Sequence, residues 1–397
     1  MKHSLLNFIS AGLAGFLFVV LLCSCGLTDE ADVVIADVNS PAVEEETLPE
    51  TDTTEEPVSR IEIAGIGYSS DLTSLSIYKP GITLEELTGK LPLFPSLESL
   101  DISHTDIHSG DALNLSKQFD NIQMLWTNEL LGNRYLSDVE ELDLSGIPVE
   151  NISDVEDSVV LFPNLKKVIM SDCGIPDEEM DELNRRHDDI QFVWTVHFSI
   201  YSLRTDTIYF CASDVPNLGN VAPELTSEQL DPLKYCTDLE ALDLGHMWYK
   251  DLNFLSGMTK MKYLILVQGK FSDLSPLANM PQLEYLELFN NNKIIDLTPL
   301  LSCKNLKHLN IGYCYFLDWE PLKQMTSLER LWMPHVGIDD VGKEELAAAL
   351  PSTEIYWPQD DPMGSTGGGW RENQSYYDMR DALHMFYMPS GTGMDNG

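Results

Sequence analysis

The sequence predicts an α/β solenoid, with a parallel β-sheet on its concave face and helices or short helical turns on its convex face. Five segments share apolar residues at their first, fourth and sixth positions: LEALDL, MKYLIL, LEYLEL, LKHLNI and LERLWM, starting at residues 239, 261, 283, 306 and 328. A nearly fixed step of this size indicates units that stack on one another. The apolar alternation at the end of each segment predicts a strand with one buried face.

The second half of each unit predicts the convex face. After a turn comes another short apolar segment, such as LSPL at 274–277 or LTPL at 297–300. We expect these segments to form short helical turns. The units resemble leucine-rich repeats, and the D-L-x-P-L element with its 22-residue step resembles the repeats of bacterial internalins.

Longer units of the same kind occupy the N-terminal half, and they are duplicated. Strands are expected at 72–77, 97–102, 139–144 and 165–170. A match at an offset of 68 residues aligns 97–127 with 165–195, which adds strands at 122–126 and 190–196 and a helix at 176–186. The pair Ser70-Asp71 recurs as Ser137-Asp138 and as Thr205-Asp206. The predicted solenoid spans 60–358, with 60–67 as its N-terminal cap.

The start of the chain predicts export and a lipid anchor. Lys2 precedes an apolar run that ends in Leu22-Cys23-Ser24-Cys25-Gly26, which is typical of a secretory signal. The run contains Asn7 and Ser10, so a permanent membrane helix is the weaker alternative. The last residues resemble the lipobox of bacterial lipoproteins, with Cys25 as the lipidated residue. The resemblance implies a signal peptide at 1–24 and a location on the extracytoplasmic face of the cell membrane; plain secretion is the alternative.

Charge excludes several classes of partner. The chain carries a formal net charge of −40, which disfavours binding to nucleic acid phosphates or peripheral attachment to anionic lipid. The segment 25–59 holds 11 acidic residues and no basic ones. We expect 25–59 to be a disordered, self-repelling spacer.

No pattern in the sequence predicts catalysis, a cofactor or a metal site, so we expect a protein that is not an enzyme. Zinc-binding, nucleotide-binding and hydrolase motifs are missing from the sequence. Cys173 and Cys314 occupy the turn position where the repeat pattern allows Asn or Cys, as at Asn291. Cys236 and Cys303 occupy a position that is apolar in other units. With Cys211 there are five cysteines besides Cys23 and Cys25, and we expect these five to be free thiols.

The register of the strands predicts where a partner binds. In each segment the residues on either side of the fourth position point away from the core, onto the concave face. Aromatic, aliphatic and a few charged side chains gather there across the regular repeats: Tyr263, Ile265, Tyr285, Glu287, Phe289, His308, Arg330 and Trp332. Exposed aromatic residues beside an arginine are typical of interface hot spots. Alanine at Tyr285 or Trp332 is therefore expected to weaken binding and to leave stability nearly unchanged. Two alternatives stay open: these residues stabilise the strand ladder, or the C-terminal helix covers them.

The residues after the solenoid, 359–397, predict a Gly-rich hinge at 364–369 and one short helix within 375–387. Apolar residues recur there at helical spacing: Tyr376, Met379, Leu383 and Phe386. The stretch from Gly369-Trp370-Arg371 onward resembles the C-terminal tail of leucine-rich-repeat proteins from anaerobic Gram-positive gut bacteria. The helix caps the last repeat or binds a partner.

The function predicted is that of a membrane-anchored extracytoplasmic leucine-rich-repeat protein whose concave face binds a protein partner. The family resemblance favours a protein over a glycan. A structural or glycan-binding component of the cell wall, with Tyr263, Tyr285 and Trp332 stacking on sugar rings, is the first alternative. An accessory subunit of a membrane complex is the second.

Overall fold

The structure of the chain is a computed structural model that describes residues 59–212, 225–316, 318–357, 370 and 373–384. The described residues all belong to one unit, Pro57–Gly397. The predicted signal peptide, almost all of the spacer and the Gly-rich hinge at 364–369 lie outside the described residues.

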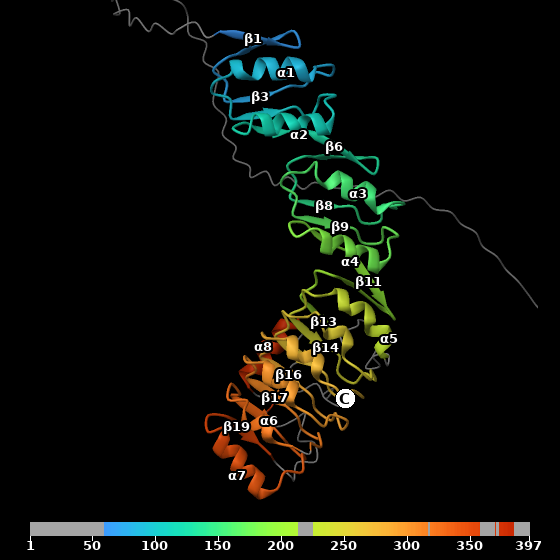
Figure 1. The fold of residues 1–397 in the computed structure, drawn as a ribbon, viewed down its shortest axis with the longest axis vertical. Helices are drawn as coiled ribbons and strands as arrows, with labels where there is room; N and C mark the ends of the chain where they lie inside the picture. Colours follow the sequence, from blue (N-terminus) through green and yellow to red (C-terminus); the bar gives the residue numbers. More distant parts are fainter. Residues whose placement is uncertain (1–58, 213–224, 317, 358–369, 371–372, 385–397) are drawn as a thin grey trace, which may run out of the picture. The chain divides into compact units, whose positions relative to one another are not determined.

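The five regular repeats build the centre of a seven-stranded parallel sheet (Figure 1). Its strands pair in sequence order: β13 (Tyr209–Cys211), β14 (Ala241–Asp243), β15 (Tyr263–Ile265), β16 (Tyr285–Glu287), β17 (His308–Asn310), β18 (Arg330–Trp332) and β19 (Glu354–Tyr356). The fourth position of each repeat is in register with the next, so that Leu264 pairs with Leu286 and Leu286 with Leu309. All three leucines are fully buried, which confirms the predicted inward face.

Short helical segments follow the strands, as predicted from the Leu-x-Pro-Leu elements. They are η2 (Asp231–Tyr235), η3 (Asn253–Leu255), η4 (Ser275–Asn279), η5 (Thr298–Ser302) and α6 (Glu320–Lys323), preceded by α5 (Ser227–Leu230) and followed by the longer α7 (Asp340–Ala349). Proline occupies the first turn of η4, η5 and α6, where its missing N–H is not needed and its fixed φ suits a helix.

The N-terminal half forms two further parallel sheets rather than a continuation of one. The first comprises β3 (Ser74–Ser76), β4 (Ser99–Asp101) and β5 (Gln123–Leu125); the second comprises β8 (Glu141–Asp143), β9 (Lys167–Ile169) and β10 (Gln191–Val193). Their helices are α1 (Leu84–Lys90), η1 (Leu91–Leu93), α2 (Ser109–Gln118), α3 (Ile152–Val159) and α4 (Asp177–Arg186). The predicted duplication is present, because α2 and α4, and likewise β5 and β10, start 68 residues apart.

An antiparallel hairpin precedes each of the three parallel sheets, and the sequence did not reveal these hairpins. They are β1–β2 (Arg60–Ile63, Ile66–Ser69), β6–β7 (Thr127–Leu130, Asn133–Leu136) and β11–β12 (Thr195–Phe198, Tyr201–Arg204). The segment at 60–67, predicted to be an N-terminal cap, is thus the first of three equivalent hairpins. The predicted strand at 190–196 is two strands, β10 and β11, divided at Trp194.

The recurring Ser-Asp and Thr-Asp pairs have a structural role at these hairpins. The Ser137 hydroxyl accepts a hydrogen bond from the backbone N–H of Trp126 at 3.0 Å, and the Thr205 hydroxyl accepts one from that of Trp194 at 3.2 Å. In both cases the residue's own N–H donates to the same tryptophan's carbonyl. The hydroxyl therefore satisfies the backbone where the parallel strand ends and the hairpin begins.

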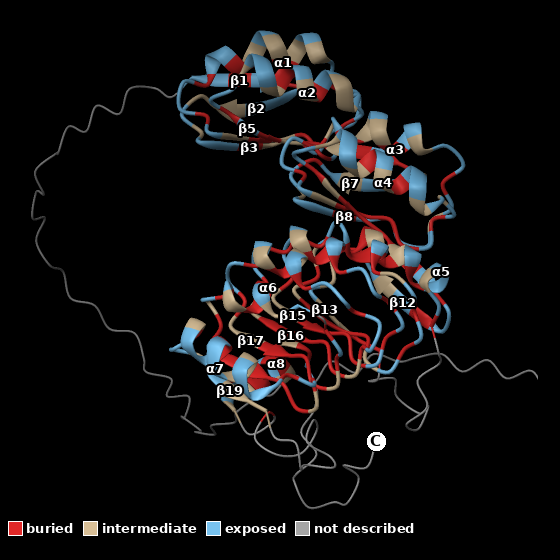
Figure 2. Ribbon diagram, turned by 60° about the horizontal axis from the view of Figure 1, so that its bottom comes forward, coloured by how far each residue is buried: buried red, intermediate tan, exposed pale blue. Residues whose placement is uncertain are grey.

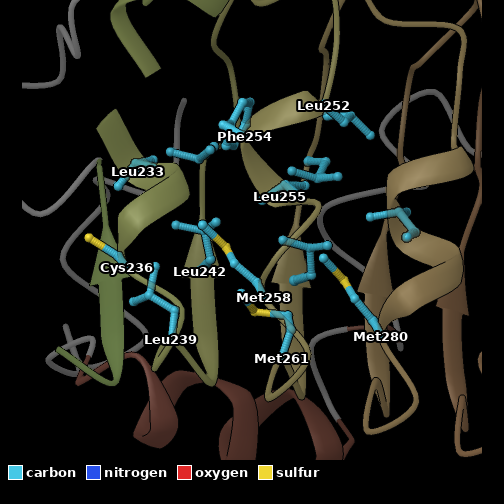
Figure 3. Packing of buried hydrophobic residues seen from close by; sticks show 14 of the residues in the cluster. Leu233, Cys236, Leu239, Leu242, Leu252, Phe254, Leu255, Met258, Met261 and Met280 are labelled. Carbon is cyan, nitrogen blue, oxygen red and sulfur yellow. The ribbon is translucent and has the colours of Figure 1, made fainter. Parts of the chain in front are cut away.

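Leucine, methionine and cysteine side chains fill the space between the strands and the helical segments, and buried residues line the strands of the seven-stranded sheet (Figure 2). In Figure 3 the side chains of Cys236, Met258 and Met280 lie in this core, each after the helical segment of its own repeat. This placement agrees with the prediction that Cys236 replaces an apolar side chain of the other repeats.

Candidate functional site

The predicted concave columns do lie on the face of the sheet opposite the leucine core. The inward leucines belong to the main core, whereas Ile265, Tyr285, Phe289 and Trp332 belong to a separate apolar cluster. The expectation that this patch is exposed is wrong. Six of the eight predicted residues are buried, and the other two, Tyr263 and His308, are half-buried.

The chain's own C-terminal segment covers the patch. Helix α8 (Gln374–Ala382) begins after Asn373, whose side chain accepts a hydrogen bond from the Ser375 N–H at 3.0 Å and so caps the helix. Its apolar residues, Tyr376, Met379 and Leu383, join Trp370 in the cluster with the sheet residues, and each is buried. The helix predicted within 375–387 is therefore present, but it packs across the face of the sheet rather than serving as a cap on the last repeat.

Contacts at both ends of the segment show that it crosses several repeats. Near its start, the Arg330 guanidinium on β18 donates to the Ser375 hydroxyl at 3.2 Å and to the Trp370 carbonyl at 3.4 Å. At its end, the His384 ring stacks on Tyr209 of β13, with 4.0 Å between centroids and 5° between planes. We call residues 370 and 373–384 the C-terminal segment.

Trp370 lies at the centre of the contact. Its indole N–H donates to Glu287 Oε1 at 2.9 Å, and the Arg330 guanidinium carbon lies 4.7 Å from its ring centroid. Its ring is 5.4 Å from that of Tyr285 and 5.9 Å from that of Trp332. We call these four sheet residues and the strand between them the Trp370 site. The side chain of Trp370 is 1% exposed, so the site excludes water from it.

Strand β17 forms the floor of the Trp370 site, because it pairs with β16 on one side and β18 on the other. His308 lies between Tyr285 and Arg330, and Asn310 lies between Glu287 and Trp332. Asn310 is 1% exposed, and its Oδ1 accepts a hydrogen bond from the Gly312 N–H at 3.1 Å. Asn310 Nδ2 and His308 Nδ1 are buried and have no hydrogen-bond partner among the residues that the structure describes.

Burial changes the acid–base properties of these groups. Desolvation lowers the pKa of His308, and the positive charge of Arg330 lowers it further, so the imidazole is kept neutral. Burial also lowers the pKa of Arg330 and raises that of Tyr285. On β14, burial raises the pKa of Asp243 to about 6, and the carboxylate of Glu287 adds to the rise.

Acidic residues of the N-terminal concave columns have a local structural role. Asp101 Oδ1 accepts from the Ser103 N–H and Asp143 Oδ1 from the Ser145 N–H, each at 2.9 Å. Asp243 makes the same bond to Gly245 at 2.8 Å. Carboxylate or amide oxygens that accept from the backbone two residues on stabilise turns, so this position is used to end a strand.

Four cysteines, Cys173, Cys236, Cys303 and Cys314, occupy the positions that the repeat pattern predicted, and they are free thiols. These four and Cys211 are all buried. Cys173 donates to the Leu144 carbonyl and Cys314 to the Leu288 carbonyl, each at 3.1 Å. Asn291 donates to the Leu266 and Leu288 carbonyls at the same position of its own repeat, which confirms that Asn and Cys serve this turn alike.

One polar arrangement on the β11–β12 hairpin escaped the sequence analysis. The ring nitrogens of His197 lie 2.8 Å from Ser202 Oγ and 2.8 Å from Asp172 Oδ1. These are the residue types of a catalytic triad. The His197 and Asp172 side chains are 58% and 65% exposed, however, and triads act in sites shielded from water. The arrangement is surface hydrogen bonding between a hairpin and a turn.

The residues that the structure describes contain neither a membrane-spanning helix nor a cluster of metal ligands. In that part of the chain, none of the helices has the length and apolar character needed to cross a membrane. Likewise, His, Cys, Asp and Glu side chains do not gather there in groups of three or more that could hold a metal ion.

Sequence reasoning found most of the Trp370 site but missed its centre. Five of the predicted residues, Tyr285, Glu287, His308, Arg330 and Trp332, surround Trp370, whereas Ile265 and Phe289 belong to the same apolar cluster and Tyr263 lies at its edge. Asn310 and Trp370 itself were not predicted. A tryptophan standing alone between a glycine run and an amphipathic helix was the available signal.

Comparisons with known proteins agree with the repeat architecture. A family model described as leucine-rich repeats in two copies matches residues 281–324. Among solved structures, internalin C2 of Listeria monocytogenes is 19% identical with a TM-score of 0.31, and the match covers 55% of this chain and 81% of that one. A leucine-rich-repeat protein of Leptospira interrogans is 18% identical with a TM-score of 0.32, and the match covers 67% and 74%.

A second Listeria monocytogenes internalin is 16% identical with a TM-score of 0.28, and the match covers 76% of this chain and 87% of that one. A comparison with curated proteins found no match. At these identities and TM-scores the likenesses carry no information about a ligand. The matched repeats and the seven-stranded parallel sheet make the chain a leucine-rich-repeat solenoid.

Proposed function

We propose that the chain is a lipid-anchored extracytoplasmic protein that binds a protein partner through the concave face of its repeats. One observation carries the proposal: this face already holds a polypeptide segment that is not a repeat. The segment buries an indole on this face and donates a hydrogen bond to Glu287. It also accepts two hydrogen bonds from Arg330. A sheet face that holds one peptide by directional bonds has the chemistry to hold another.

Buried charged groups support a recognition role for this face. Glu287 and Arg330 are 8% and 6% exposed, although they lie on the outer side of the sheet. Burying charged groups costs free energy unless hydrogen bonds compensate for it, so apolar residues would serve a purely structural contact better. Aromatic and arginine anchors enclosed by less critical contacts are the usual composition of a protein interface.

The occupied state favours a protein over the glycan alternative. The rings of Tyr285 and Trp332 that would stack on sugars are buried against Trp370. A glycan would first have to remove the apolar side of an amphipathic helix, whereas a peptide could replace it with contacts of the same kind. The proposed attachment rests on the sequence at Cys25, and the acidic segment 25–59 would hold the repeats away from the membrane.

Photo-cross-linking tests the proposed binding face. A benzophenone amino acid replaces Tyr263, which lies half-buried at the edge of the patch, in the full chain within the cells that make it. The matched control replaces Leu93, an exposed residue of η1. We expect a discrete protein adduct from position 263 and none from position 93. Equal adducts from both positions, or an adduct that wall polysaccharide abolishes, would contradict the proposal.

The mass of the mature N-terminus tests the anchor. Diacylated or triacylated Cys25 is the expected first residue. A retained Met1, or a free amine on any other residue, would show that the lipid anchor is absent.

A further inference from the structure

The C-terminal segment leaves a buried polar group in the floor of the Trp370 site without a hydrogen bond. Asn310 lies between Glu287 and Trp332, both of which Trp370 contacts, and its Nδ2 has no hydrogen-bond partner within the described part of the chain. The orientation of this amide is not arbitrary, because its oxygen accepts from the Gly312 N–H. The nitrogen must therefore be the atom left without a partner.

Tryptophan is chemically unable to satisfy that group. An indole offers one N–H donor and no acceptor, and its N–H already bonds Glu287 Oε1. A buried donor without an acceptor is costly, and native proteins contain few of them. The second floor atom, His308 Nδ1, is also buried without a hydrogen-bond partner among the described residues. The site therefore fits a ligand better than it fits its present occupant.

We propose that the Trp370 site receives a tyrosine side chain from a partner peptide, which displaces the C-terminal segment. A phenol hydroxyl can donate to Glu287 and accept from Asn310 Nδ2 at once. Its ring keeps the contacts with Tyr285, Trp332 and Arg330 that the indole makes. This inference rests on the proposed function and names the chemistry of the partner: an aromatic residue bearing a hydroxyl, followed by an amphipathic helix that replaces α8.

Labelled peptides in trans test the inference. The probes follow residues 369–384, with Trp, Tyr, Phe or Ala at the position of residue 370, and fluorescence anisotropy measures their binding to the full chain carrying Trp370→Ala. We expect the Tyr peptide to bind about fivefold or more tightly than the Phe peptide, which is the effect of one hydrogen bond. The Ala peptide should not bind. Equal binding of Tyr and Phe peptides would overturn the role of the hydroxyl.

Two further measurements guard the interpretation. Asn310→Leu, added to Trp370→Ala, should reduce the affinity for the Tyr peptide about fivefold and leave that for the Phe peptide nearly unchanged. The wild-type chain should bind the Tyr peptide at least tenfold more weakly, because its tethered segment competes at an effective concentration on the order of millimolar. If no peptide binds a Trp370→Ala chain that retains its circular dichroism spectrum, the segment is a fixed part of the fold and the inference is wrong.

The result of the peptide-binding experiment does not depend on the result of the cross-linking experiment in cells. Tyrosine-selective peptide binding without any cross-linked protein in cells would support the site and refute the proposed function. A cross-linked protein without peptide binding would support the proposed function and refute the tyrosine site.

Discussion

Replacing Trp370 with alanine should release the C-terminal segment while the repeats stay folded. The indole is 1% exposed and donates to Glu287, so its removal costs both apolar burial and a charge-assisted hydrogen bond. Truncation of a buried tryptophan costs about 3–5 kcal/mol. Every 1.4 kcal/mol is a factor of ten in an equilibrium constant. The docking equilibrium of the segment should fall roughly a hundredfold to a few thousandfold.

Hydrogen exchange measures this change residue by residue. The protection factors of the α8 amides should fall by that factor. If the wild-type protection factors are smaller than that, α8 should lose protection completely, because the segment is then already undocked. The amides of β14–β18 should keep theirs. Trp248→Ala is the matched control, since Trp248 is 47% exposed and lies in the same half of the chain. Unchanged exchange of α8 in Trp370→Ala would refute the reasoning.

Three further predictions follow from the same contacts. Leu286→Ala, at a fully buried ladder position, should lower the free energy of unfolding by about 2–5 kcal/mol in a denaturant titration, whereas Tyr285→Ala should chiefly increase exchange in α8; the opposite result would mean that the strand faces are reversed. Burial raises the pKa of Asp243 from about 3.8 to about 6, so its stabilising effect is complete below pH 3.8 and is lost as the pH rises through 6. Asp243→Asn should therefore stabilise the chain by up to about 3 kcal/mol at pH 7.5 and by little at pH 3.5, and equal effects at both would contradict the buried carboxyl. In the absence of reductant, alkylation should label all five cysteines of the unfolded chain but not those of the folded chain, where they are buried. Two cysteines that stay unlabelled after unfolding would indicate a disulfide.

The repeats could be predicted from sequence because each strand depends on local alternation and on a neighbour of the same pattern. Leu264, Leu286 and Leu309 pair in the predicted register, and the Asn or Cys turn position is used as expected. The hairpins were missed because their strands are only four residues long: RIEI of β1 and TVHF of β11 alternate polar and apolar residues, but over too few residues to indicate a hairpin. Ser137 and Thr205 were noticed as repeats, but only the structure shows that they receive the backbone N–H of a tryptophan.

The sequence raised covering of the patch by the C-terminal helix as an alternative, which the structure confirms, but it could not decide between covering and exposure. The outward direction of Tyr285 and Trp332 follows from register, but their exposure depends on what lies above them. Trp370 is separated from Trp357 by twelve residues, 358–369, and a connection of that length does not fix where the segment packs. Both side chains are buried, so alanine at Tyr285 or Trp332 should cost stability through loss of the contact with the C-terminal segment, contrary to the expectation from sequence.

The most direct test of the account is hydrogen exchange of the wild-type chain while the tyrosine peptide is added. The account predicts that the amides of α8 lose protection as the peptide saturates the Trp370 site, and that the strands β14–β18 stay protected throughout. Binding of the peptide with α8 still fully protected would place the peptide elsewhere and contradict displacement of the C-terminal segment.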